Sequence, residues 1–272
     1  MSKGKHRDIP LFATPIIETH CHLDYLDPVQ LQDTLTRSRA VGIERIVTIA
    51  VSASNLDSVL ALTRVAPDIW GTQGVHPHEA ESFTPEVAEI IRERGSDERI
   101  VAVGEIGLDY FYDHADRAVQ RSVFAAQLAL AVDLDLPVVI HTREADEDTR
   151  AILAEYAPHL RRKGVIHSFT SGMALAEFCL EAGFMLGFNG ITTFNRADNV
   201  REVVAATPLD QLVLETDSPY LTPVPYRGRP NAPFYLPFIA ERIAEVLEIP
   251  VETLLASAYR NSLALFFPNT PQ

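Results

Sequence analysis

Eight short runs of apolar and β-branched residues recur along the chain, and helical periodicity follows most of them. In Arg117–Leu134, for example, apolar residues such as Val119 and Val123 return at spacings of three and four, which is typical of a helix face. Thr84-Pro85 predicts another helix start, with an N-cap followed by proline. The predicted strands are Pro15–His20, Arg45–Val51, Ile69–His76, Ile100–Glu105, Pro137–His141, Gly164–His167, Phe184–Gly190 and Gln211–Asp217.

The interval between these runs is that of one strand plus one helix. Eight such units in 272 residues predict an α/β fold, a (β/α)8 TIM barrel that forms a single domain over residues 1–272. The alternative is an open doubly wound sheet, which normally has a glycine-rich phosphate-binding turn after its first strand. The first run is followed by ETHCHLD at residues 18–24, which contains no glycine. The barrel is therefore favoured.

Histidines and carboxylates stand where the predicted strands end. In such a barrel the carboxyl ends of the strands form the active face. Two of the histidines are separated by one residue, so in an extended chain both imidazoles point to the same side, as one metal ion requires. The strand-end set comprises His20, His22, His76, Glu105, His141, His167 and Asp217. Their convergence on one rim predicts a metal centre.

The two strand-end carboxylates have distinct expected roles. Glu105 ends an apolar run, where an ionised carboxylate is costly unless compensated. An ion pair with arginine is one explanation, but bridging two cations also explains why it faces several histidines. Asp217 could bind a metal ion, position a water and accept its proton, the alternative being a turn cap. Glu18 and Glu215 stand two residues before a ligand and are predicted to support the histidines.

Other residues are candidates for substrate contact. His76 could hold a substrate phosphate, although a structural loop histidine is the alternative, and that alternative is favoured for His78. The loop at residues 220–231 carries Tyr226, which could stack on a base, and Arg227, which could contact phosphate in a forked geometry. A plain surface loop is the other interpretation of this segment.

Composition limits the class of partner. The chain has 23 Lys and Arg against 37 Asp and Glu, a formal charge of −14, which argues against a broad basic face that tracks duplex DNA. A substrate held through bound metal ions is not excluded. No run approaches the roughly 20 apolar residues of a membrane span. Two cysteines, Cys21 and Cys179, are expected to be buried and inert, and with no apolar leader we expect a cytoplasmic protein.

The chain resembles the TatD family of metal-dependent deoxyribonucleases, which belongs to the amidohydrolase-type barrels. The resemblance covers nearly the whole chain, and its motifs keep their order. They are THCHLD at 19–24, GVHPH at 74–78, GEIGLDY at 104–110, PVVIH at 137–141, IHSF at 166–169, LETDSPY at 214–220, PYRG at 225–228 and NSLALF at 261–266.

The resemblance implies two divalent ions. One would be held by His20, His22, Glu105 and Asp217, and the other by Glu105, His141 and His167. It also implies that His76 contacts substrate and that Asp217 serves the attacking water. Two positions depart from the family pattern. Glu18 stands where aspartate is common and could tilt the two neighbouring histidines, and Thr170 replaces another small residue, which could alter the cleft wall.

These features together predict hydrolysis of phosphodiester bonds in nucleic acid, with no membrane and no obligate protein partner. Imidazole ligands suit Zn²⁺ or Mn²⁺, whereas the resemblance points to Mg²⁺, so the ion stays open. An acidic molecule favours an exonuclease that acts on single-stranded ends.

Three other functions are alternatives to a nuclease. The first is an amide, lactone or ester hydrolase of the same superfamily, many of which bridge their ions with a carboxylated lysine on strand 4. Lysines occur only at Lys3, Lys5 and Lys163, so none is available for that position, and Glu105 serves directly. The second, again by resemblance, is a D-aminoacyl-tRNA deacylase. The third, a non-catalytic scaffold, is disfavoured because the ligand set is complete.

Overall fold

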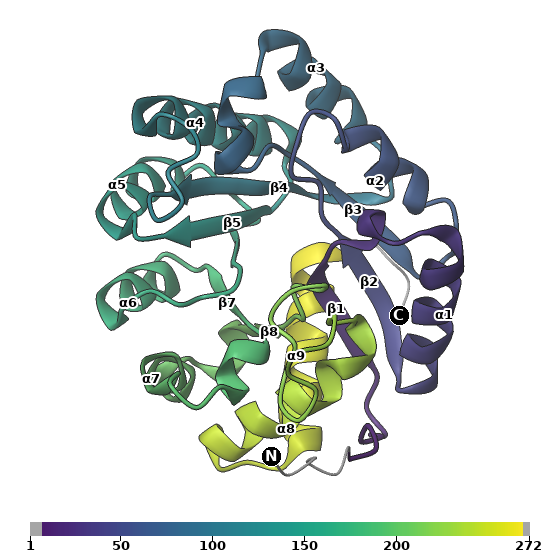
Figure 1. The fold of residues 1–272 in the computed structure, drawn as a ribbon. Coiled ribbons are helices and arrows are strands. Elements are labelled where there is room, and N and C mark those ends of the chain that lie inside the picture. Colours follow the sequence, from purple (N-terminus) through teal and green to yellow (C-terminus); the bar gives the residue numbers. More distant parts are fainter. Residues whose placement is uncertain (1–6, 269–272) are drawn as a thin grey trace.

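The computed structural model describes residues 7–268, and eight parallel strands form one sheet in chain order. The strands alternate with helices that lie around the outside of the ring (Figure 1), which confirms the predicted (β/α)8 barrel. The strands are β1 (Ile16–Cys21), β2 (Ile43–Thr48), β3 (Ile69–Gln73), β4 (Ile100–Asp109), β5 (Val138–Arg143), β6 (Gly164–Ile166), β7 (Met185–Phe188) and β8 (Leu212–Leu214).

The ring is closed where the chain after β8 meets β1. The Asp217 amide donates to the His20 carbonyl at 2.9 Å, and the His22 amide donates to the Ser218 carbonyl at 2.9 Å. The surrounding helices are α1 (Pro28–Ala40), α2 (Leu56–Leu62), α3 (Pro85–Arg94), α4 (Arg117–Leu134), α5 (Asp146–Tyr156), α6 (Met173–Glu181), α7 (Asp198–Ala206), α8 (Leu236–Leu247) and α9 (Val251–Phe266). Short 3-10 helices are η1 (Leu23–Tyr25), η2 (Pro77–Ser82), η3 (Gly190–Thr193), η4 (Leu209–Gln211) and η5 (Pro233–Tyr235).

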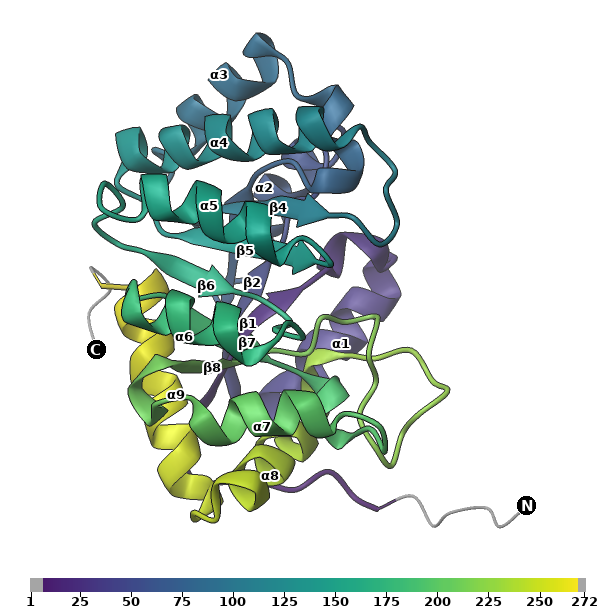
Figure 2. The same cartoon turned by 90° about the vertical axis from the view of Figure 1, so that its left-hand side faces the viewer.

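Apolar side chains fill the amino-terminal end of the barrel. Val47, Val139 and Val213 from three strands share a buried cluster with Phe266 at the end of α9. Figure 2 shows α9 on the side of the barrel opposite to the tips of β4 and β5. Because this end is closed by a helix and packed with hydrocarbon, polar chemistry is confined to the carboxyl ends of the strands.

Several predicted strand ends were wrong. β2, β3, β6, β7 and β8 end before the predicted residue, so His76 lies beyond β3 and instead caps η2, where its Nδ1 accepts from the His78 amide at 3.1 Å. β4 and β5 run further than predicted, because they pair with each other as far as Asp109 and Arg143. Gly107 permits this pairing, since a Cβ there would lie 1.9 Å from the His141 carbonyl oxygen.

Predictions for helices and cysteines fared better. α4 has the predicted bounds, and Thr84 caps α3 through the Val87 amide at 3.3 Å. Cys21 and Cys179 are both buried in the apolar core. None of the helices within residues 7–268 combines the length and apolar character that a membrane crossing requires. Lys3 and Lys5 lie outside the described residues.

Candidate metal centre

Glu105 lies at the middle of the strand-end cluster, and its two oxygens face different histidines. The Oε2 atom is 3.3 Å from His20 Nε2. The Oε1 atom is 2.9 Å from His167 Nε2, 3.1 Å from His141 Nδ1 and 3.4 Å from His76 Nε2. One buried carboxylate therefore joins imidazoles from four segments of the barrel, namely β1, β5 and the chain after β3 and after β6.

Asp217 completes the set on the β1 side. Its Oδ1 is 3.5 Å from His22 Nε2 and 3.7 Å from His20 Nε2. The residue follows β8 with a φ of 56°, a left-handed conformation that few side chains adopt. The backbone bond to His20 that closes the barrel also holds Asp217 in this place.

The donor atoms form three groups in which all nitrogens and oxygens lie within 4.8 Å of one another. The groups are His20, His22 and Asp217; His20, Glu105 and His167; and His76, Glu105 and His141. The buried His20 Nε2 has no hydrogen-bond partner within the part of the chain that the structure describes, although two carboxylates face it. A cation satisfies such an atom, so the residues fit a metal ion. All seven strand-end residues of the sequence meet here.

The carboxylates are held in their ionised form. Burial raises the pKa of Glu105, but the imidazoles of His167, His76 and His20 outweigh it and hold the pKa well below its usual range. Burial likewise raises the pKa of Asp217, and its contact with His22 more than reverses that effect. Both side chains thus offer anionic oxygens at neutral pH.

The histidines divide into two kinds. Burial lowers the pKa of His20, and it lowers that of His76 to about 4, so both are neutral at physiological pH and have a lone pair available. At His141 and His167 burial also lowers the pKa, but neighbouring carboxylates more than reverse this effect and raise the pKa above its usual value. These carboxylates are Asp109 and Glu105 at His141, and Glu105 at His167.

Glu18 and Glu215, each two residues before a candidate ligand, contact the cluster in different ways. Glu18 Oε1 accepts the backbone amides of His20 at 3.0 Å and Thr216 at 2.9 Å, so it joins β1 to the chain after β8. Burial raises the Glu18 pKa to about 8. Glu215 Oε1 lies 3.4 Å from His167 Nδ1. Glu215 thus lies beside an imidazole ring, as predicted, but His167 Nδ1 forms no hydrogen bond within residues 7–268, whereas Glu18 contacts its histidine through the backbone.

Asp109 was missed by the sequence reasoning, which ended the strand at Glu105. Its Oδ2 lies 2.9 Å from His141 Nε2 and 3.1 Å from His78 Nε2, so it fixes the orientation of one candidate ligand and holds the neighbouring histidine. The sequence signal that could have identified Asp109 is the alternation of side-chain direction along a strand. Glu105, Gly107 and Asp109 are spaced by two, so they share a face of an extended chain.

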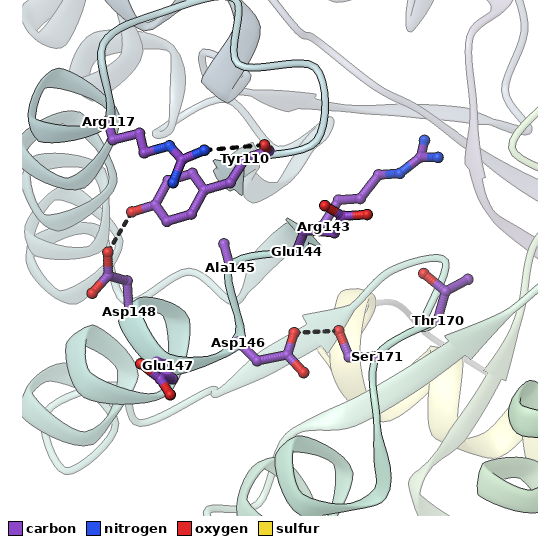
Figure 3. A pocket seen from close by; sticks show the side chains of 10 residues that line it. All are labelled: Tyr110, Arg117, Arg143, Glu144, Ala145, Asp146, Glu147, Asp148, Thr170 and Ser171. Atoms are coloured by element: carbon purple, nitrogen blue, oxygen red, sulfur yellow. Dashed lines mark hydrogen bonds between the residues drawn. The ribbon is translucent and has the colours of Figure 1, made fainter.

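A cavity of about 600 Å³ lies beyond the carboxyl ends of β4 and β5 (Figure 3), and none of the seven strand-end residues lines it. On one side Tyr110 donates a short hydrogen bond of 2.5 Å to Asp148, and Arg117 donates to the Tyr110 carbonyl at 3.4 Å. Arg143 lies across the cavity with its guanidinium directed away from that group. Thr170 also lines this cavity.

The two residues predicted on the loop after β8 are held by other contacts. The Tyr226 ring stacks on Tyr235 with centroids 4.6 Å apart, and its hydroxyl donates to the Arg7 carbonyl at 2.8 Å. The Arg227 guanidinium lies 3.8 Å from the ring centroid of Phe194. Their expected roles towards substrate stay predictions.

A TIM barrel with histidines and carboxylates gathered at the carboxyl ends of its strands defines the class of metal-dependent hydrolases. The chain belongs to the TatD family, since residues 17–267 match the family model described as TatD related DNase. The resemblance inferred from the motifs is confirmed.

Individual relatives agree with this membership. The uncharacterized metal-dependent hydrolase YabD of Bacillus subtilis is 36% identical over 92% of this chain and 98% of that protein. The 3'-5' ssDNA/RNA exonuclease TatD of Erwinia amylovora is 38% identical over 85% of this chain and 91% of that protein. The crystal structure of YjjV, a TatD homologue from Escherichia coli, superposes with a TM-score of 0.87 at 32% identity, covering 94% of this chain and 98% of that one. The protein is thus an enzyme, a metal-dependent hydrolase that acts on ester bonds.

Proposed function

We propose that the protein removes nucleotides from the 3′ ends of single-stranded nucleic acid by phosphodiester hydrolysis with two divalent ions. The observation that carries the proposal is Glu105, whose Oε2 faces His20 while its Oε1 faces His141 and His167. The similarity to a protein named as a 3'-5' ssDNA/RNA exonuclease supports the substrate class. We place the reaction in the cytoplasm, with the one barrel as the whole catalytic unit and no obligate protein partner.

The proposed ligands follow the two sides of Glu105. One ion would be held by His20, His22, Glu105 and Asp217, and the other by Glu105, His141 and His167. Bound there, such ions polarise phosphate oxygens and lower the pKa of water. The mixed donor set is compatible with Zn²⁺, Mn²⁺ or Mg²⁺.

Asp217 is the proposed proton acceptor. Its side chain is more exposed than that of Glu105, at 14% against 4%, so it can reach a water molecule. The contacts that lower its pKa keep the carboxylate ionised and able to accept a proton. We propose that His76, whose neutral Nε2 lies 3.4 Å from Glu105, contacts the scissile phosphate.

The position of Lys163 argues against the lysine-bridged hydrolases. Its ammonium donates to the Ala157 carbonyl at 2.6 Å and the residue precedes β6, at the amino end of the barrel. Glu105 occupies the central position that a carboxylated lysine would otherwise take. The described part of the chain therefore offers no lysine for that chemistry.

The test begins with protein stripped by a chelator. Mg²⁺, Mn²⁺ or Zn²⁺ is restored separately, and mononucleotide release is followed from single-stranded oligonucleotides labelled at either end. Asp217→Asn should abolish the release. Asp210→Asn is the matched control, because it removes the same charge from exposed η4 at the other end of β8.

The proposal predicts release from the 3′ end that depends on a restored ion and on Asp217. A D-aminoacyl-tRNA is assayed in parallel. Folded, metal-loaded protein that cleaves this ester but neither DNA nor RNA would refute the nuclease assignment in favour of the deacylase.

A further inference from the structure

The exposed aromatic rings of the molecule gather beside the metal centre. Four large aromatic side chains are exposed in the described part of the chain, namely Tyr25, Phe111, Tyr112 and Tyr220. The Tyr25 ring stacks on the candidate ligand His22 with centroids 5.2 Å apart. The Tyr112 ring lies 5.3 Å from that of His78, which contacts Asp109. Exposed rings cost free energy in water, and their concentration at one rim indicates a binding role.

Arg143 lies against one of these pairs. Its guanidinium carbon is 3.9 Å from the ring centroid of Phe111 and 4.9 Å from that of Tyr112. Within residues 7–268 this guanidinium forms no ion pair or hydrogen bond. The nearby Arg117 and Arg121, in contrast, are paired with acidic side chains. An uncompensated cation beside the centre of a chain with a charge of −14 is a ready contact for an anion.

The same backbone that carries the metal centre also positions this pair of rings. Asp109 Oδ1 accepts the amides of Phe111 at 3.0 Å and Tyr112 at 2.8 Å. Gln120 of α4 accepts the Asp109 amide at 2.9 Å and so anchors the turn. The other oxygen of Asp109 contacts His141, which places the rings at a fixed distance from that candidate ligand.

We propose that Phe111, Tyr112 and Arg143 form a nucleotide-binding subsite, here called the aromatic–arginine platform. It rests on the proposed function and takes the nucleotide next to the scissile phosphodiester. The base stacks on the ring faces that Arg143 leaves open, and the Arg143 guanidinium donates to the phosphate. Stacking of this kind requires an unpaired base and tolerates any base, which matches a single-stranded substrate of mixed sequence.

Charge around the cavity restricts the path of the strand. Glu144, Asp146 and Glu147 also line it, so a phosphate is repelled from the beginning of α5. Asp146 is already engaged, since it accepts from the Ser171 hydroxyl at 2.8 Å. Of the two arginines that line the cavity, Arg117 is paired with Asp113, which leaves Arg143 as the contact for a phosphate.

The first experiment tests stacking. Metal-loaded enzyme is assayed on pentathymidylate and on the same strand with an abasic unit next to the terminal nucleotide. In the wild type the missing base should lower kcat/KM about tenfold. In Phe111→Leu and Tyr112→Leu the intact-to-abasic ratio should fall towards one. Because each variant is compared with itself, the ratio does not depend on how much active protein is recovered.

The second experiment tests the phosphate contact by salt dependence. A pentathymidylate with phosphorothioate linkages is titrated in the presence of metal at increasing salt. Arg143→Gln should make the slope of log affinity against log salt less steep by about 0.7. Arg150→Gln is the matched control, because its guanidinium also lies against a ring, that of Phe178 at 5.3 Å, and the same charge is lost away from the cavity.

The outcomes separate the subsite from the proposed function. The platform is refuted if the wild type releases nucleotides but the leucine variants keep the wild-type ratio and the two glutamine variants share one salt slope. The proposed function fails in a different way, when the folded wild type releases nothing from either strand with any ion.

Discussion

Replacing Asp109 with asparagine should weaken one metal site selectively. The ionised carboxylate only accepts hydrogen bonds, so its Oδ2, 2.9 Å from His141 Nε2, fixes the imidazole proton there. The Nδ1 lone pair is then available for an ion on the Glu105 side, at 3.1 Å from that carboxylate. In Asp109→Asn an amide donor faces Nε2 instead, which favours the tautomer with its proton on Nδ1.

The size of the effect follows from this role. Losing the carboxylate partner of a metal-bound histidine typically costs about 10- to 100-fold in metal affinity, or roughly 1.4 to 2.8 kcal/mol. Hydrogen bonds from His141 and His78 hold the pKa of Asp109 below its usual value against the effect of burial, so a full negative charge is lost on substitution. The group formed by His20, His22 and Asp217 does not include His141 and should keep its ion.

The assay is a competition titration of stripped protein with Zn²⁺ and a chromogenic chelator, fitted for two sites. Asp113→Asn is the control, because it removes the same charge from the following loop, where Asp113 pairs with Arg117 at 3.0 Å. We expect two wild-type affinities in the control and one weakened affinity in Asp109→Asn. Equal titration curves for Asp109→Asn and the control would refute the proposed role of Asp109.

Other predictions concern bridging, barrel closure and the thiols. Glu105→Gln should lower the metal content of reloaded protein from two ions per chain, and unchanged content by mass spectrometry would contradict a bridging role. Glu18→Ala removes the acceptor for two buried amides that join β1 to the chain after β8, so urea unfolding should show a loss of about 2–4 kcal/mol, and a change below about 0.5 kcal/mol would refute this. Burial raises the Cys179 pKa to about 12 and that of Cys21 well above its usual value, which favours the neutral thiols in the fold. Neither should react with a disulfide reagent at pH 8 before urea unfolds the chain, and rapid labelling of native protein would show this burial to be wrong.

The candidate ligands were predictable because each ends or follows a strand that is visible in the local sequence. His141 and His167, for example, close short apolar runs rich in β-branched residues, which recur at the interval of one strand plus one helix. Barrel topology then brings all carboxyl ends to one rim, whatever the exact strand boundaries. This is why the cluster was predicted although His76 lies beyond β3 rather than at its end.

Contacts between distant segments were not predictable in the same way. Nothing local shows that β4 continues to Asp109, because that extension depends on pairing with β5. The ring of Tyr226 could be assigned to a substrate from composition, but its direction is set by Tyr235 and by the Arg7 carbonyl, 219 residues away. Loop composition identifies which side chains are available, whereas tertiary packing decides which of them face the site.

Asp109 joins the two halves of the proposed mechanism, and its two oxygens allow them to be separated. Oδ2 contacts His141 on the metal side, while Oδ1 accepts the amides that shape the turn at Phe111 and Tyr112. Asparagine retains one carbonyl oxygen for that turn, so Asp109→Asn should lower the affinity for one metal ion yet keep the intact-to-abasic ratio of the wild type. Alanine retains neither oxygen, so Asp109→Ala should lower that metal affinity and also bring the ratio towards one. A ratio that collapses equally in the two variants would mean that the turn depends on the metal side rather than on Oδ1.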